Sequence, residues 1–323
     1  MDGVPIKALM GLLFVGVLMG ALDLAIIGPA LPAIQAEFDM TDRGLAWLFS
    51  IYVLFQLVAT PLLAKLSDRY GPRAIYVVSV SAFAVGSLIL AVSPWAEGLF
   101  VGRAIQGFGG AGIFPVAASV IGQAFPPEKR GGALGLLGAV FGMAFLLGPI
   151  LGGLLLPFGW QWLFLINLPI AAALIFGALR LLPAGDSTHT PTPFDWLGAV
   201  TISVTLTALA FAVTNFDSAN TAQSLRSIEV WPWLLCFVAF APIFWRVEQG
   251  AVDPILRPAF FSNSQIRLTS LIGLGVGLLE SGTVFFPLLA VAAMGVSDST
   301  AAWLLLPGVL VTTVAAPLVG MLV

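Results

Sequence analysis

Three ionisable residues lie well inside long apolar runs of this sequence: Asp23, Arg103 and Glu280. Placing such a side chain at the centre of a bilayer costs about 2.5–3.5 kcal/mol on the insertion scale, so each is expected to face a cavity or a partner. A carboxyl group in a low-dielectric cavity can take up and release a proton in the physiological pH range. Asp23 and Glu280 are therefore candidate proton carriers, and a buried structural ion pair is the alternative.

Arg103 contributes a permanent positive charge, because a guanidinium does not lose its proton in a protein. A nearby acid such as Asp23 would have its proton affinity tuned by that charge. The sequence alone leaves open whether the two side chains meet. We expect Arg103 to be the tuning charge of the site.

Each candidate acid shares one helical face with two glycines, at positions i, i+4 and i+7. The two sets are Gly16, Gly20 and Asp23, and Gly273, Gly277 and Glu280. Small residues on one face admit a neighbouring helix or a ligand closely. A shift of 257 residues superposes the two sets, and a shift of 256 superposes residues 46–48 on 302–304. We interpret the last part of the chain as the start of a second copy of its beginning.

Long apolar runs must position these residues. The hydrophobic fraction is 59% and the mean hydropathy is +1.04, above the roughly 45–50% apolar usage of soluble domains. The sequence therefore predicts an all-α polytopic membrane protein. Cutting at polar, proline and glycine clusters predicts ten spans, at residues 8–31, 45–66, 74–93, 98–124, 132–156, 161–182, 195–215, 231–246, 266–292 and 300–323.

The distribution of Lys and Arg predicts the orientation, because their excess marks cytoplasmic loops. With a cytoplasmic N-terminus, ten of these residues fall inside and only Arg43 and Arg226 fall outside. We expect a multi-pass protein of the inner or plasma membrane with its N-terminus in the cytoplasm. Its expected partners are the lipid bilayer and, if the two candidate acids carry them, protons.

Several classes of function are disfavoured. A net charge of −3 indicates no nucleic-acid partner, and the single cysteine, Cys236, excludes an internal disulfide. The single histidine, His189, lies in a polar stretch, which excludes a histidine-based intramembrane enzyme. We expect no enzyme, no metal and no cofactor beyond a proton gradient.

A charge-dense segment at residues 64–73 lies between the second and third spans and is expected to be a short loop in water. Asp68 and Arg69 could bridge to neighbouring helix ends and hold one conformation, and Gly71 and Arg73 complete this predicted gating hairpin. The alternative is an ordinary solvated loop, whose exposed ion pairs contribute about 0–1 kcal/mol.

The fifth span is rich in glycine around one proline. Proline removes a backbone hydrogen bond, and glycines allow tight packing or sliding. We predict a hinge or a close-packed gate, although packing alone would also explain the glycines. The residues of this predicted hinge are Gly138, Gly142, Gly148, Pro149, Gly152 and Gly153.

Linker composition at the end of the sixth span divides the chain. We predict a six-helix N-terminal half at 1–182, a cytoplasmic linker at 183–194, two inserted helices at 195–250, and the first two helices of a C-terminal half at 251–323. Because four more helices would complete that half, we interpret the chain as truncated.

Residues 64–73 resemble the loop signature between the second and third helices of the major facilitator superfamily, with Ala64 and Pro72 departing from it. The pattern Leu99-x-x-x-Arg103-x-x-Gln106-Gly107 resembles that family's fourth-helix signature, and residues 138–153 resemble its antiporter signature. The resemblance implies the major facilitator fold, with Arg103 and Gln106 as charge-tuning residues of a substrate cavity.

Residues 22–34 and 160–169 are similar to the fourteen-helix drug:proton antiporters of the EmrB/QacA type, with Gln161 in place of their usual arginine. In that family two extra helices separate the six-helix halves, as in the segment that follows residues 194–198 here. The resemblance implies proton-coupled efflux of small, amphiphilic or drug-like molecules by alternating access. The alternatives are an uptake symporter or uniporter of the same fold, and a membrane scaffold or sensor without transport.

Overall fold

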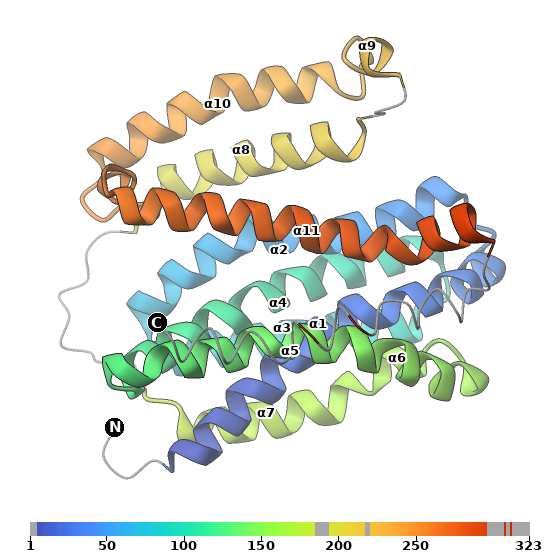
Figure 1. The fold of residues 1–323 in the computed structure, drawn as a ribbon, viewed down its shortest axis with the longest axis horizontal. Helices are drawn as coiled ribbons and strands as arrows, with labels where there is room; N and C mark the ends of the chain where they lie inside the picture. Colours follow the sequence, from blue (N-terminus) through green and yellow to red (C-terminus); the bar gives the residue numbers. More distant parts are fainter. Residues whose placement is uncertain (1–4, 185–193, 217–219, 296–306, 308–310, 312–323) are drawn as a thin grey trace.

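A computed structural model describes residues 5–184, 194–216 and 220–295, together with Pro307 and Val311. Every regular element in these residues is a helix, as the composition predicted. Figure 1 shows long helices lying roughly side by side. His189 and the predicted tenth span, apart from Pro307 and Val311, lie outside the described residues.

The first six predicted spans form one helical block. Its elements are α1 (Ile6–Phe38), α2 (Asp42–Tyr70), α3 (Pro72–Val92), α4 (Ala96–Ala124), α5 (Pro127–Leu155), η1 (Leu156–Phe158), α6 (Trp162–Leu165) and α7 (Asn167–Leu181). The sixth span is thus two helices, α6 and α7, that meet at Ile166. Within the block, α4 packs most extensively on α3 and α2, and α1 packs on α5.

Glycines in α4 explain why its backbone lies so close to its neighbours. A Cβ atom added to Gly107 would overlap the carbonyl oxygen of Tyr52 in α2, and one added to Gly109 would overlap the backbone of α3 at Ser79 and Phe83. Small residues at such positions let helix backbones approach in a membrane, where packing and hydrogen bonds drive association. As a result, α4 is the most enclosed of the spans, with 61% of its most apolar window buried.

Two further helices pack against each other beside this block: α8 (Trp196–Thr214) and α10 (Trp231–Gly250), connected through the short α9 (Thr221–Ser224). Aromatic contacts join them to α2. Phe211 of α8 lies 4.9 Å from Trp47 of α2 and 4.6 Å from Trp233 of α10, measured between ring centroids. The chain continues through η2 (Pro258–Ser262) into α11 (Ser264–Met294), whose described side chains are largely exposed.

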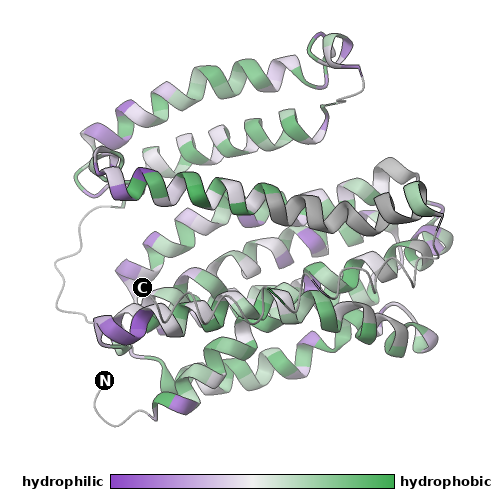
Figure 2. Cartoon of the chain, in the orientation of Figure 1, coloured by the Kyte–Doolittle hydropathy of each residue, from purple (hydrophilic) through white to green (hydrophobic). Residues whose placement is uncertain are grey.

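Seven helical segments of the described residues are long and apolar enough to cross a membrane: Ile6–Gly28, Gly44–Tyr70, Pro72–Val92, Ala96–Ala124, Pro127–Gly152, Trp162–Leu181 and Trp196–Thr214. They coincide with the first seven predicted spans. Figure 2 shows apolar residues along most helix lengths and hydrophilic ones concentrated near helix ends. The predicted eighth and ninth spans are helical, as α10 and α11, but are not among the seven.

The expectation of a ten-residue loop at 64–73 is wrong. Residues up to Tyr70 belong to α2 and α3 begins at Pro72, so Gly71 is the whole connection. Gly71 has φ 87° and ψ 153°, a conformation that glycine adopts without the steric cost of a Cβ atom. Pro72 then starts α3 at a position where its missing N–H group is not needed. Asp68 and Arg69 consequently lie on the last turn of a helix.

Candidate functional site

Asp23 lies at the centre of the six-helix block and is fully buried. Its Oδ2 accepts a 2.5 Å hydrogen bond from Nη1 of Arg103, with which it forms an ion pair. Its Oδ1 accepts a 2.7 Å bond from Nε2 of Gln106 and a 3.5 Å bond from Nδ2 of Asn167. Residues 80 and more positions apart in the sequence thus meet at one carboxylate.

Gln106 and Asn167 extend the network to α3. Nε2 of Gln106 donates to Oγ of Ser87 at 2.8 Å, and Nδ2 of Asn167 donates to the same oxygen at 3.3 Å. The Ser87 hydroxyl donates in turn to the carbonyl oxygen of Phe83 at 2.9 Å. Because Oε1 of Gln106 also accepts from Arg103 at 2.8 Å, the glutamine amide ties the two charged residues together.

The Arg103 guanidinium is not fully satisfied. Nε donates to the carbonyl oxygen of Leu48 at 3.3 Å, and Cζ lies 4.2 Å from the centroid of the Tyr52 ring. A cation over an aromatic face is stabilised by the ring quadrupole. However, Nη2 of Arg103 and the hydroxyl of Tyr52 are buried without a hydrogen-bond partner. Buried polar atoms of this kind are uncommon and indicate a place where a group can be bound or rearranged.

This geometry gives the network two arrangements of charge. With Asp23 ionised, its negative charge is compensated by Arg103 and both oxygens are hydrogen-bonded. With Asp23 protonated, the guanidinium loses its counter-charge, and an uncompensated buried charge is strongly unfavourable. Proton binding at Asp23 would therefore favour a structure in which Arg103 finds water, an anionic group or another partner.

The structure describes the surroundings of only some of the other predicted site residues. Glu280 lies in α11, and Pro149 and Gly153 lie in α5. The side chains of Glu280 and Pro149 and the surroundings of Gly153 are outside the described residues. At the α2–α3 connection, Nε of Arg73 donates to the carbonyl oxygen of Leu182 at 2.7 Å, which ties the start of α3 to the end of the block.

The glycines of the predicted hinge differ in their surroundings. A Cβ atom added to Gly148 would lie 2.5 Å from Cβ of Ala25 in α1, whereas one added to Gly138 would have no neighbour within 4 Å. α5 continues as one helix through this glycine-rich region. The close approach of α5 at Gly148 is therefore to Ala25, which lies two residues along α1 from Asp23.

Sequence reasoning did not single out Ser87, Tyr52 or Asn167. Asn167 falls within residues 160–169, which carried a family resemblance, so a signal for it existed. Ser87 and Tyr52 lie in apolar runs and look like ordinary helix residues. Only their contacts with Gln106 and Arg103 show that they belong to the site.

The helical fold, the seven candidate spans and a charged network buried among them define a polytopic membrane protein. The family described as Major Facilitator Superfamily matches residues 13–323. The chain belongs to this superfamily, in agreement with the resemblance of its motifs.

Named relatives extend this result. The chain is 38% identical over 323 residues to "Uncharacterized MFS-type transporter YfiU" of Bacillus subtilis (strain 168), covering 98% of this chain and 62% of that protein. It is 32% identical over 301 residues to "Multidrug resistance protein 3" of the same organism, covering 91% of this chain and 57% of that protein. "Efflux pump dotC" of Dothistroma septosporum (strain NZE10 / CBS 128990) is 32% identical over 334 residues, covering 99% of this chain and 56% of that protein. The chain thus spans less than two thirds of the length of these relatives.

A solved structure of similar fold is that of the human organic anion transporter MFSD10 (TETRAN). The TM-score is 0.54 at 15% sequence identity, and the match covers 98% of this chain and 86% of that one. At this identity the likeness is one of fold.

Proposed function

We propose that this chain belongs to a proton-coupled efflux antiporter for small, amphiphilic or drug-like molecules. The observation that supports the proposal most directly is the fully buried network in which Asp23 is held by Arg103 and Gln106. Asp23 is the proton carrier, Arg103 is the charge that responds to its protonation, and Gln106 holds both in place. The proposed energy source is the electrochemical proton gradient, which comprises the membrane potential and the pH difference.

The coupling step follows from the charge balance. A proton on Asp23 cancels the negative charge that compensates Arg103, so the closed network is favoured only in the ionised state. Release of that proton restores the ion pair and the closed arrangement. Alternating access then follows if the closed and open networks belong to opposite orientations of the helical halves. One charge crossing 100 mV supplies about 2.3 kcal/mol, before any pH gradient is added.

The proposal also includes the direction of transport, which is efflux, and the subfamily, which is the EmrB/QacA type. Efflux is supported by the names of two relatives, a multidrug resistance protein and an efflux pump. The EmrB/QacA type is supported by α8 and α10, which follow the six-helix block as a separate pair. Glu280 is the proposed second proton carrier, and Gly148 is the position where the proposed α5 hinge contacts α1.

The test is transport in proteoliposomes by the protein expressed from its complete coding sequence, with ethidium as the fluorescent substrate and an imposed pH gradient. The D23N side chain keeps the shape of aspartate but cannot take up and release a proton. The rate of gradient-driven transport should therefore fall by at least about tenfold relative to the wild-type protein. E97Q, at an exposed residue, is the matched control. Undiminished gradient-driven transport in a folded D23N protein would contradict the proposal, and accumulation of substrate with the proton flow would favour the uptake symporter.

A further inference from the structure

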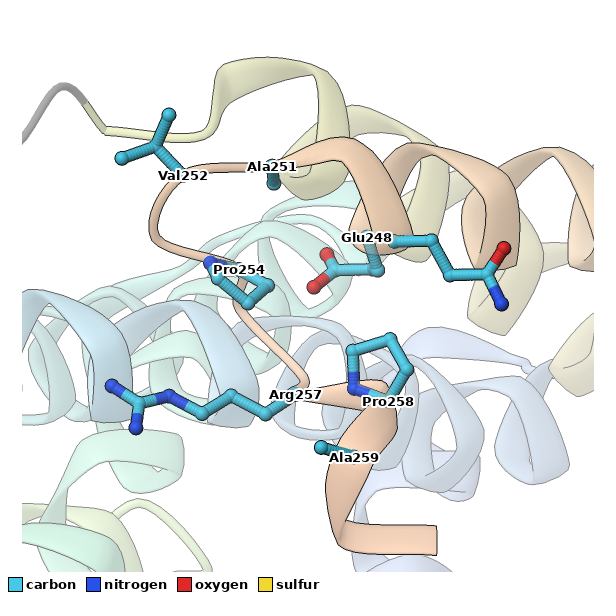
Figure 3. A pocket seen from close by; sticks show the side chains of 8 residues that line it. Glu248, Ala251, Val252, Pro254, Arg257, Pro258 and Ala259 are labelled. Carbon is cyan, nitrogen blue, oxygen red and sulfur yellow. The ribbon is translucent and has the colours of Figure 1, made fainter. Parts of the chain in front are cut away.

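A pair of carboxyl groups lies apart from the Asp23 network, where the start of α8 meets the end of α10. Glu248 is in the last turns of α10 and only 2% exposed. Asp195 immediately precedes α8 and is its N-cap residue. Figure 3 shows the Glu248 carboxylate between α10 and the following loop that carries Pro254. The proton-coupling mechanism proposed above does not use either residue.

Each carboxyl group has one oxygen with a clear backbone partner. Oδ1 of Asp195 accepts a 2.7 Å hydrogen bond from the backbone N–H of Gly198, which caps α8. Oε2 of Glu248 accepts a 2.8 Å bond from the backbone N–H of Leu256, which holds the loop after α10. The two remaining oxygens, Oδ2 of Asp195 and Oε1 of Glu248, are buried and have no hydrogen-bond partner.

The two unpartnered oxygens converge on one place. A Cβ atom added to Gly198 would overlap Oδ2 of Asp195 and would lie 2.5 Å from Oε1 of Glu248. Both oxygens therefore occupy the space beside the α-carbon of Gly198, which is itself buried. Glycine at this position leaves room for both carboxyl groups to meet.

Two ionised carboxylates cannot satisfy each other, because each offers only acceptors. Neither nearby cation donates a hydrogen bond to the two unpartnered oxygens. Lys65 of α2 forms an ion pair with Asp253, and Arg257 lines the pocket beside Glu248. Asp68 of α2 adds a further carboxyl group, which interacts electrostatically with Lys65, Asp253 and Arg257. A single proton on Oε1 of Glu248 would supply the missing donor, since Oε2 must remain an acceptor for Leu256.

We propose that Asp195 and Glu248 bind one proton between them. This shared proton holds α8, α10 and the loop that follows α10 (residues 251–257) together. Oε1–H of Glu248 donates to Oδ2 of Asp195, while Oδ1 and Oε2 keep their backbone partners. Both buried oxygens are then satisfied, and one negative charge remains on the pair in place of two.

The electrostatic surroundings agree with this protonation state. The pKa of Glu248 is raised above its ordinary value: burial raises it most, and the negative charge of Asp195 also raises it. The backbone at Leu256 and Ile255 and the positive charge of Lys65 act in the opposite direction without cancelling this rise. A carboxyl group whose pKa is raised by folding stabilises the structure at low pH, and that contribution is lost as the pH rises through the raised pKa. The α8–α10 contact should therefore loosen with increasing pH.

A pocket gives protons a route to Glu248. An open pocket of about 370 Å³ lies beside Glu248 and is lined also by Gln249, Val252, Pro254 and Arg257. The loop between α10 and η2 contains Asp253, which pairs with Lys65 near the end of α2. Loosening of this loop would thus change the attachment of the extra helices to the six-helix block.

Amide variants give the sharpest test, because each replaces the shared proton by a permanent N–H donor. In E248Q the amide nitrogen can donate to Oδ2 of Asp195, and in D195N the new amide can donate to Oε1 of Glu248 while its oxygen still caps α8. The double variant D195N/E248Q places two donors against each other. E128Q, at an exposed glutamate, is the control.

Two measurements on the purified protein in nanodiscs test the proposal. One titrating infrared C=O stretching band of a protonated carboxyl should be present in the wild-type protein, in E128Q and in D23N, and absent from E248Q and from D195N. A band from protonated Asp23 is recognised because it disappears in D23N. Hydrogen–deuterium exchange of the segment containing Leu256 should become at least about tenfold faster in the wild-type protein than in E248Q as the pH rises, because only the wild-type protein loses a stabilising proton. The double variant should exchange fast at every pH.

The proposal is overturned if wild-type and E248Q proteins exchange in parallel across the pH range. It is also overturned if every titrating band that D23N retains survives both single substitutions. Protection that follows added Na⁺ or Mg²⁺ at constant pH would replace the proton by a bound cation. Neither measurement requires transport, so failure of the proposed antiport would leave this test intact.

Discussion

Arg103 and Asp23 illustrate how a buried charge depends on its partner. Removing two ions from water is costly, and their attraction compensates only when the geometry is good and the remaining atoms are hydrogen-bonded. Here both oxygens of Asp23 are bonded, whereas one guanidinium nitrogen is not. The ionised pair is therefore better satisfied on its acidic side.

A double-mutant cycle tests this interdependence. D23N leaves Arg103 without a counter-charge, and R103M leaves Asp23 without one, so each single variant should lose about 3–5 kcal/mol of unfolding free energy. In D23N/R103M neither buried charge remains, and the loss should be clearly smaller than the sum. Denaturant unfolding in detergent, followed by tryptophan fluorescence, measures all four proteins. Additive losses would show that the two residues do not act as a pair.

Helix α5 approaches α1 closely at one glycine of the predicted hinge and not at another. The backbone of α1 at Ala25 lies against Gly148, and Asp23 is on the same helix. A shift of α5 along α1 would thus be felt near the buried acid. The structure contains α5 as one continuous helix, so the proposed hinge motion is a displacement from the described conformation.

Two alanine substitutions in α5 separate packing from helix propensity. G148A adds a methyl group against Ala25 and should destabilise the protein by about 1–3 kcal/mol through overpacking. G138A adds the same group to open space and should be neutral or stabilise by up to about 1 kcal/mol, because alanine favours the helix. Thermal unfolding of the two variants measures the difference. Equal changes in stability would show that close packing of α5 on α1 at Gly148 does not limit the size of the side chain there.

A third glycine substitution addresses the connection between α2 and α3. Gly71 has a positive φ that side chains with a Cβ rarely adopt, so G71A should cost about 1–2 kcal/mol. G122A is the control, since a Cβ atom there would have no neighbour within 4 Å. A stability of G71A equal to that of G122A would mean that the turn relaxes without strain.

One end of the whole molecule gathers the ends of several helices. Lys65 near the end of α2 pairs with Asp253 after α10, and Arg73 at the start of α3 binds the backbone at Leu182 after α7. Hydrophilic residues are concentrated near helix ends (Figure 2). Basic residues mark the cytoplasmic side of membrane proteins, so this end should face the cytoplasm.

Cysteine accessibility tests that orientation. In a background without native cysteines, which within these 323 residues requires only C236S, K129C should be labelled by a membrane-impermeant maleimide only after the cells are opened. E97C, at the start of α4 and therefore at the opposite end of the helices, should react in intact cells. Labelling is read as a mass shift after purification. The reverse pattern would place the N-terminus outside.

Several features of the fold were predictable because they depend on local composition. Seven predicted spans coincide with helices, since about twenty apolar residues are needed to cross a bilayer wherever they occur. Asp23 and Arg103 were recognisable because a charge in an apolar run stands out in the sequence alone. The predicted loop at 64–73 failed for a local reason as well, because one glycine sufficed to turn the chain.

The sequence by itself determined the class of protein, the helices and two of the charged residues. Tertiary structure decided that Asp23 meets Arg103, that Ser87 and Asn167 complete their hydrogen bonds, and that Asp195 lies beside Glu248. The physical reason is that hydropathy acts along the chain, residue by residue. Partners of a buried polar group are chosen across helices, by which backbones the small residues allow to approach.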